Sequence, residues 1–533
     1  MHRRSNRQFN IQAMSSIQLC QTLKDRDVLS KPIITEIYNR ALFLLQTEEA
    51  RYNRLQFNAR GLATILYQFA KLNYVIGHEF IDAWTNKAIN LMDEFNSQDL
   101  ANSLWALGRL GTQPQDTFIQ AWIHHATNSI ENFNTQNLAN SLWALGQLGI
   151  QPQDTFIQAW IHHATNSIEN FNTQELANPL WALGRLGIQP QDTFIQAWIH
   201  HATNSIENFN TQNLANSLWA LGRLGIQPQD TFIQAWIHHA TNSIENFNTQ
   251  GLANSLWALG QLGIQPQDTF IQAWIHHATN SIDNFNTQEL ANSLWALGRL
   301  GIQPQDTFIQ AWIHHATNSI DNFNTQELAN SLWALGRLGI QPQDTFIQAW
   351  IHHATNSIEN FNTQSLANSI YGIFILNVLY NSKIKVPQPF IDAVNKNIEL
   401  FDENNENISQ ILKAHYYFGK QGVGILTSQN RKFLEKKFKT NLTPCHTSNL
   451  QLNVLKVVKK VLAQHTVTSE HYIKQITSSV DIFIKEQNTV IQVDGPYHFD
   501  NNNVPNISTK LNTELLKSYG YIVHRIPYWV WDK

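Results

Sequence analysis

The sequence has few cysteines, few charged residues and no long apolar segment. Only Cys20 and Cys445 occur among 533 residues, which excludes a disulfide scaffold and a cysteine-rich zinc site and fits a reducing compartment. No run of about 18 apolar residues is present, so we expect neither a membrane span nor a membrane partner. We therefore predict an intracellular protein, placed in the cytoplasm or in an organelle.

The few charges are unevenly distributed along the chain. Residues 99–364 carry 18 acidic and 5 basic side chains, a formal charge of −13, whereas residues 1–98 carry +3 and residues 365–533 carry +6. Neutralisation of phosphates dominates most nucleic-acid binding, so this central shortage of cations weighs against nucleic acid as a partner of the middle of the chain. The argument weakens if acids such as Asp154 and Glu169 lie on a different surface from the basic residues.

What the chain does contain is a repeat of 38 residues. A clean copy is NLANSLWALGQLGIQPQDTFIQAWIHHATNSIENFNTQ, residues 137–174, and seven near-identical copies fill residues 99–364. Each copy predicts two helices, the first over about 136–148, capped by Asn134 or Thr135 and ended by Gly149, and the second capped by Asp154 or Thr155. Such hairpins bury their apolar faces only by stacking, which predicts an α-solenoid with a curved inner surface.

The predicted fold is mainly α, a solenoid of 38-residue helical hairpins followed by a small α+β domain. The expected organisation is a basic tail and irregular helical cap (1–60), a degenerate repeat (61–98), seven clean repeats (99–364), degenerate repeats with a basic helical cap (365–465) and the α+β domain (470–533). Residues 1–16 are basic and lack acids, which suits either a transit peptide or, as we prefer, a basic tail.

Variation among the copies is concentrated at two positions of the first helix. The first variable position is occupied by Asp99, Asn137, Glu175, Asn213, Gly251, Glu289, Glu327 and then Ser365. The second is occupied by Arg109, Gln147, Arg185, Arg223, Gln261, Arg299 and Arg337. An unvarying asparagine lies between them, as Asn102, Asn140, Asn178 and Asn216. At about 100° per residue these positions form one polar stripe on the helix.

This stripe has two open interpretations. Stacked repeats would turn it into a ladder in which each repeat contacts one RNA base, with the arginines on phosphates or bases. Alternatively, the first variable position lies in the first turn, where Asp, Glu, Asn and Ser are favoured by capping and by the helix dipole. The seven His-His pairs, such as His124 and His125, are expected to be exposed polar residues, because adjacent helical residues point too far apart to chelate a metal.

The motif LANSLWALGRLGIQPQDTF resembles the octotricopeptide repeat family, over about residues 61–400. The family commonly has a proline-rich link where this chain has QPQDTF. Its members are sequence-specific RNA binders that act in organelle gene expression. The resemblance implies that the first helices line an RNA groove.

The last residues predict strands over 480–484, 489–495 and 521–527, with a helix over 509–518 before the third strand. The strings VIQVDGPYHF and STKLNTELLKSYGYIVHRIPYWVW closely resemble the RAP domain. That family is regarded as RNA-binding and related to restriction-endonuclease-like nucleases. RAP domains commonly follow helical repeats of this kind.

The nuclease relationship raises the possibility of catalysis. Asp481 matches the first acid of such a site, Asp494 lies at the end of the adjacent strand, and His498 could act as a base. Asp481, Gln492 and Asp494 would be the ligands of a divalent metal, Mg²⁺. Gln492 stands where related sequences often have Glu, and the motif lacks its lysine. A binding pocket without catalysis is therefore the preferred interpretation, with Lys510 as a phosphate contact.

The sequence as a whole predicts a monomeric protein that recognises single-stranded RNA, roughly seven to ten nucleotides at about one per repeat, in post-transcriptional regulation. The RAP domain would add RNA contacts, with no cofactor unless it cleaves. Two alternatives stay open: a solenoid scaffold that binds a protein partner, and a repeat-guided metal-dependent RNA endonuclease.

Overall fold

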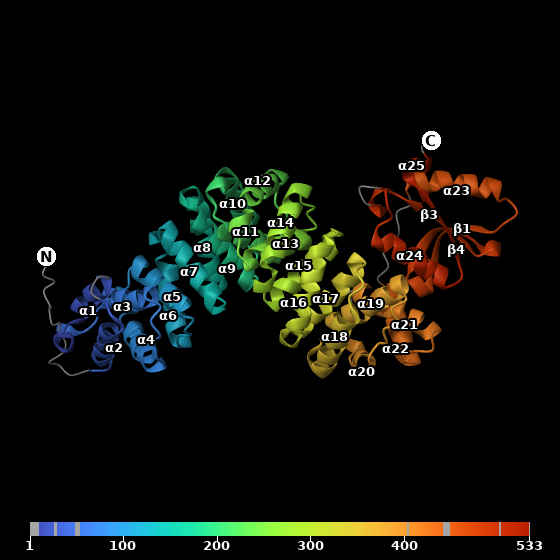
Figure 1. Cartoon of the computed structure of the whole chain (residues 1–533). Coiled ribbons are helices and arrows are strands. Elements are labelled where there is room, and N and C mark those ends of the chain that lie inside the picture. The colour runs from blue at the N-terminus through green and yellow to red at the C-terminus, as the bar shows by residue number, and fades with distance from the viewer. Residues whose placement is uncertain are drawn as a thin grey trace. The chain divides into compact units, whose positions relative to one another are not determined.

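The computed structural model describes residues 10–25, 29–47, 54–401, 405–440, 448–499 and 503–531. Most of the proposed tail or transit peptide, residues 1–9, lies outside this range. The chain divides into two compact units, Met1–Phe247 and Asn248–Lys533, which are considered separately. Figure 1 shows helical hairpins in both units and a sheet near the C-terminus.

The first unit begins with irregular helices and continues as regular hairpins. Its helices are α1 (Ser16–Lys24), α2 (Lys31–Gln46), α3 (Ala59–Lys71), α4 (His78–Asn90), α5 (Ser97–Leu110), α6 (Asp116–Asn128), α7 (Thr135–Leu148), α8 (Asp154–Ser167), α9 (Thr173–Leu186), α10 (Asp192–Asn204), α11 (Thr211–Leu224) and α12 (Asp230–Asn242). Short 3-10 turns such as η6 (Ile168–Asn170) join consecutive hairpins. The predicted α-hairpin repeat is confirmed.

The ends of the first helices follow the capping rules in each clean repeat. In α7, the Asn134 side chain accepts a hydrogen bond from the Asn137 N–H, and Gly149 ends the helix with φ 68°. The second helices differ from the prediction: Asp154 is the first residue of α8, and its N-cap, Gln153, makes no side-chain cap. The prediction that Asp154 or Thr155 caps this helix was therefore wrong, because the preceding Pro152 and the extended Gln153 already set its start.

One set of contacts closes each hairpin, and a second set holds the hairpin to its neighbour. The tryptophan of each second helix is buried, and the Trp160 indole Nε1 donates to the Leu138 carbonyl at 3.0 Å. The first helices approach one another so closely that a Cβ added to Gly146 would lie 2.7 Å from the Ala182 Cβ. The LWALG motif therefore encodes close packing of the first-helix layer, whereas the later glycine, Gly149, ends the helix.

The second unit continues the same pattern and then departs from it. Its helices before the sheet are α13 (Thr249–Leu262), α14 (Asp268–Ser281), α15 (Thr287–Leu300), α16 (Asp306–Asn318), α17 (Thr325–Leu338), α18 (Asp344–Asn356), α19 (Thr363–Tyr380), α20 (Gln388–Lys396), α21 (Asn405–Lys420), α22 (Ser428–Thr440) and α23 (Asn449–Val461). Helix α19 is longer than its counterparts, and α24 (Ile507–Ser518) packs against it.

The C-terminal part is a four-stranded mixed sheet. The strands β1 (Val467–Ile473), β2 (Ser478–Ile484), β3 (Thr489–Asp494) and β4 (Ile522–Pro527) lie in the order β1-β2-β3-β4. The pairs β1–β2 and β2–β3 are antiparallel, and β4, which follows α24, runs parallel to β3. Three strands and the helix were predicted, but β1 was missed, since its VTSEHYI sequence is mostly polar and half-exposed.

Helix α23 covers one side of this sheet. Val454 and Leu455 of α23 pack on Ile482, with Ile491 and Ile526 beside them. Within the described part of the chain, no helix has the length and apolar content needed to cross a bilayer.

Candidate nucleic-acid interface

The first helices present a recurring set of accessible side chains. In α7, Asn140 and Trp143 are half-buried and Gln147 is exposed, at spacings of three and four residues that keep them on one face. Equivalent residues in α5 are Asn102, Trp105 and Arg109. We call this set, one Asn, one Trp and one Arg or Gln per repeat, the first-helix surface.

Aromatic rings run along the first-helix surface of the first unit. The ring centroids of Tyr67 and Trp105 lie 5.0 Å apart, and those of Trp105 and Trp143 lie 6.3 Å apart. The Arg185 guanidinium lies 5.3 Å from the Trp181 ring centroid. Leu138, Leu142 and Leu145 form the apolar face of α7, and the helical spacing adds Trp143 to that face; the structure instead leaves Trp143 half-exposed next to the polar stripe. The aromatic part of this surface was therefore missed from sequence.

The first variable position has a different environment. Most of its side chains are buried: Asp99, Asn137, Asn213, Glu289, Glu327 and Ser365. The carboxylates of Glu175, Glu289 and Glu327 accept hydrogen bonds from the N–H of the N-cap residue, completing capping boxes. Asn137 instead donates to the Ser97 hydroxyl at 3.5 Å. The three glutamates thus perform the capping role that was the alternative to base recognition, while Gly251 has no side chain to form such a contact.

Acidic residues of the repeats mostly lie on other elements. In the copy formed by α7 and α8, exposed Asp154 begins α8 and exposed Glu169 lies in η6. The cations of the repeats, such as Arg109 and Arg185, lie on the first helices. Because the basic residues lie on the first helices and most acidic residues lie on other elements, the first-helix surface is less acidic than the net charge of the repeats implies.

The two histidines of each pair have separate roles. His125 Nε2 contacts the Phe95 carbonyl oxygen at 2.9 Å, and the same contact recurs between His163 and Phe133. The first histidine of each pair, such as His124, is exposed and contacts Asn128 on its own helix. The second histidine is thus a connector between the second helix and the turn before the first helix, rather than a fully exposed residue.

The RAP-like region contains a cavity of about 660 Å³ that brings together the predicted catalytic residues. Asp481, Gln492, Asp494 and His498 all line it. Burial raises the pKa of Asp481 to about 6, although its Oδ2 accepts a 2.6 Å hydrogen bond from the Val493 N–H. The Asp481 N–H in turn donates to Gln492 Oε1 at 3.0 Å.

These residues do not fit a divalent-metal centre. Asp494 Oδ1 accepts a 2.7 Å hydrogen bond from Arg525 and lies 3.6 Å from His498 Nδ1, so its charge is already neutralised. The Gln492 carbonyl oxygen is held by the Asp481 N–H. No cluster of three or more Asp, Glu, His or Cys side chains suited to a metal occurs in the described ranges. Asp494 and Gln492 are thus engaged by protein groups and not free to hold a metal for cleavage.

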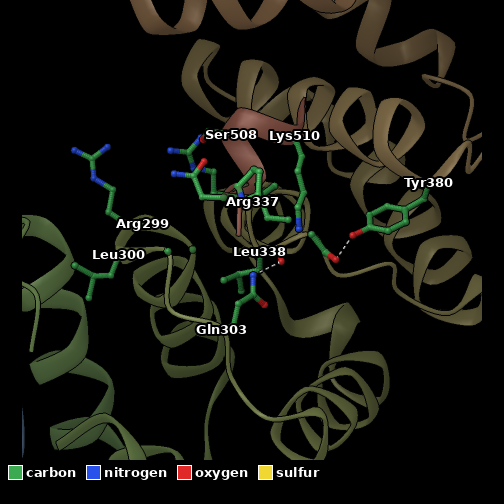
Figure 2. Close-up of a pocket in the computed structure, with 14 residues that line it drawn as sticks. Arg299, Leu300, Gln303, Arg337, Leu338, Tyr380, Ser508 and Lys510 are labelled. Carbon is green, nitrogen blue, oxygen red and sulfur yellow. Dashed lines mark hydrogen bonds between the residues drawn. The ribbon is translucent and has the colours of Figure 1, made fainter. Parts of the chain in front are cut away.

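Lys510, the predicted phosphate contact, lies in a neighbouring pocket of about 460 Å³. Figure 2 shows its side chain with those of Arg299 and Arg337, which come from α15 and α17. The structure thus brings two residues of the second variable position together with a residue of α24.

The fold and these surfaces define a helical-repeat protein that ends in a small α+β domain. The chain belongs to the family described as Tbc2 translation factor, N-terminal domain, which matches residues 88–264, 163–340 and 277–398. Residues 491–533 match the RAP domain. The predicted helical-repeat protein with a C-terminal RAP domain is confirmed.

Other comparisons are less specific. No curated protein matches the chain. Among solved structures, the crystal structure of an engineered protein shares 11% identity, with a TM-score of 0.36, covering 76% of this chain and 98% of that one. A homology model of the full-length AP-3 complex shares 10% identity, with a TM-score of 0.23, covering 84% and 90%.

Proposed function

We propose that this protein binds single-stranded RNA along its first-helix surface and acts in post-transcriptional regulation. The observation that carries the proposal is the recurring set of Asn, Trp and Arg or Gln on successive first helices, with the tryptophan half-exposed except at Trp333. The name of the matching family, a translation factor, and the presence of a RAP domain support an RNA-associated function. The motif resemblance to octotricopeptide repeats points the same way.

Each member of the first-helix surface suits a different part of a nucleotide. A tryptophan face stacks on any unpaired base, worth about 1–3 kcal/mol per base. The asparagine amide offers both a donor and an acceptor to a base edge. Arginine binds phosphate or base, whereas glutamine at the same position lacks the charge. Sequence preference would then arise where the copies differ, at the Arg or Gln position above all.

Buried capping groups at the first variable position limit its part in recognition. Glu175, Glu289 and Glu327 already accept a backbone hydrogen bond, so a base would have to compete with the cap. We propose that this position affects RNA binding mainly by stabilising the start of the first helix. It contacts a base directly only through carboxylate lone pairs that the capping hydrogen bond does not use.

The charge distribution favours binding through bases over binding of any polyanion by charge alone. Because few cations lie on each repeat, stacking and hydrogen bonds must supply most of the affinity, and the salt dependence should be shallow. For single strands the slope of log K against log salt is about −0.7 per phosphate neutralised. A site with few neutralised phosphates would therefore keep its affinity near physiological salt.

The test is selection from a randomised single-stranded RNA pool by the purified full chain, at near-physiological salt and with magnesium present. An enriched motif of roughly seven to ten bases supports the proposal, at about one base per repeat. Weak, strongly salt-sensitive binding without enrichment would instead favour a scaffold for a protein partner. Shortened RNA in the same samples would revive the endonuclease hypothesis.

A further inference from the structure

Two of the arginines at the second variable position, Arg299 and Arg337, line a pocket to which residues of the RAP domain also contribute. The pocket has a volume of about 460 Å³, and its lining includes Gln303, Tyr380 and Lys510. Three cationic side chains from α15, α17 and α24 therefore line one pocket, which is drawn in Figure 2.

Within the described part of the chain, no acidic side chain lines this pocket, although Glu406 lines a second cavity together with Arg299 and Arg337. Among the described residues, Arg299, Arg337 and Lys510 take no part in the ion pairs of the chain, which elsewhere join, for example, Arg525 to Asp494. Like charges repel one another, and an anion that enters between them relieves this repulsion.

The surroundings of Arg337 extend the same positive region. A smaller cavity of about 210 Å³ is lined by Arg299, Arg337 and Lys413, with Glu406 as the acid beside them. Burial, followed by the nearby charge of Arg337, lowers the pKa of Lys413 to about 8. Trp333 and Tyr371 line this cavity too, so aromatic side chains accompany the cations.

Arg337 also connects the repeats to the RAP cavity. It is the last residue of the second variable position, and it lines the 660 Å³ cavity that contains Asp481 and Asp494. Ser508, in the first turn of α24, lines both the cationic pocket and the RAP cavity. A strand lying on the first helices α15 and α17 would thus reach the RAP cavity beside Arg337, in a cavity that Asp481 and Asp494 also line.

We propose that the pocket formed by Arg299, Arg337 and Lys510 binds phosphodiester groups of the RNA strand where it passes from the repeats into the RAP cavity. This inference rests on the proposed RNA-binding function and adds a path for the strand. The RAP domain then holds nucleotides that flank the sequence bound by the repeats. The planar guanidinium groups of Arg299 and Arg337 can each donate two hydrogen bonds to phosphate oxygens. The flexible Lys510 side chain adds a third cation from α24.

The experiment compares two RNAs on the full chain, the sequence selected by the repeats and the same sequence extended by several nucleotides at either end. We expect wild type to bind the extended RNA more tightly. The double variant Arg337→Gln with Lys510→Gln should abolish this gain. It should weaken the short RNA no more than the loss of one repeat arginine does, which the Arg185→Gln control measures. The slope of log K against log salt for the extended RNA should become shallower by about 0.7 for each phosphate that the variant fails to neutralise.

The repeats supply a matched control. Arg185→Gln makes the same change at the same position of a repeat in the first unit, and Gln147 and Gln261 show that glutamine is native there. This control should weaken both RNAs equally and preserve the gain from extension. If the Lys510→Gln variant melts at a lower temperature, Ser508→Asp replaces it, since an acid in the first turn of α24 is compatible with the helix and repels phosphate.

The outcomes separate the two proposals. If wild type binds neither RNA, the proposed function fails and this inference fails with it. Binding of the short RNA without a gain from extension, or a gain that survives the double substitution, overturns only the inference. Inorganic phosphate or a mononucleotide serves as the second arm: Lys510-dependent binding of these, with no preference for extended RNA, would show a small-anion site instead of an RNA passage.

Discussion

Arg525 and Asp494 form a buried ion pair in the RAP domain, with Nη1 and Oδ1 2.7 Å apart. The Asp494 side chain is 2% exposed and that of Arg525 is 15% exposed. Arg525 also donates to Thr513 and Asn512 of α24, so it links β3, β4 and the helix. The acid proposed from sequence as a catalytic group or metal ligand therefore holds the domain together.

Replacing Asp494 with Asn should destabilise the RAP domain strongly, by about 3–5 kcal/mol, because it leaves the Arg525 charge buried without its partner. Limited proteolysis and thermal melting of the full chain would measure the effect. The double variant Asp494→Asn with Arg525→Gln removes both charges and should recover part of the stability. Equal stability of wild type and Asp494→Asn would contradict this account of the pair.

The two tryptophans of one repeat should respond differently to alanine. Trp160 is fully buried, so Trp160→Ala should cost about 3–5 kcal/mol of stability. Trp143 is half-exposed on the first-helix surface, and Trp143→Ala should reduce RNA affinity by about 1–3 kcal/mol because a base can then no longer stack there, while lowering the melting temperature less.

RNA affinity and melting temperature, measured on the same preparations of the two variants, test this prediction. If Trp143→Ala binds the selected RNA as tightly as wild type, the tryptophans of the first-helix surface do not stack on bases. Trp160→Ala serves as the control for weaker binding through unfolding.

Gly251→Glu should stabilise the fifth clean repeat. Glycine in a helix costs about 1 kcal/mol relative to alanine, and a glutamate there would complete the capping box seen at Glu289 and Glu327. We expect a higher melting temperature for the full chain. A change in one base of the selected motif would show that this position also contacts RNA.

Glu289→Gln separates capping from base recognition, because glutamine also serves in a capping box but carries no charge. If capping is the role of this position, the variant should melt and select RNA like wild type. A changed base preference with unchanged stability would assign the position to recognition after all.

Asp481 should make stability depend on pH. Its carboxyl pKa is raised by burial to about 6 in the folded protein, above the ordinary value of 3.8. The unfolded chain therefore loses this proton first, and stability contributed by the protonated form declines as pH rises from about 4 to about 6.

The variant Asp481→Asn removes this titration but retains an oxygen for the Val493 N–H. Its melting temperature relative to wild type should be similar near pH 4 and higher near pH 7, as the sign of the linkage requires. Parallel pH curves for the two proteins would show that Asp481 does not titrate in this window.

Much of the fold could be predicted because the repeat is self-consistent at several levels. Asparagine caps, αL glycines and the spacing of leucines all specify the same first helix, and the copies agree with one another. Strand β1 could not be recognised in this way, since VTSEHYI has little apolar alternation. The second-helix caps were misplaced because Asp and Thr are also common in the first turn.

The candidate sites were predicted less completely than the fold. The Asn and Arg or Gln positions were found from their place on the first helix, and the RAP acids from motif resemblance. Whether Glu289 contacts a ligand or its own backbone depends on a hydrogen bond that sequence does not encode uniquely. The same holds for Trp143, whose helix face is visible in sequence but whose exposure depends on how the neighbouring repeats cover it.

The sequence by itself determined the repeat period, the two helices of each hairpin and the presence of a RAP domain, because these depend on local caps, turn residues and apolar spacing. Tertiary structure alone decided that Asp494 is paired with Arg525 and that Arg299, Arg337 and Lys510 share one pocket. These residues are far apart in the chain, and only packing of α24 against α17 and α19 brings them together.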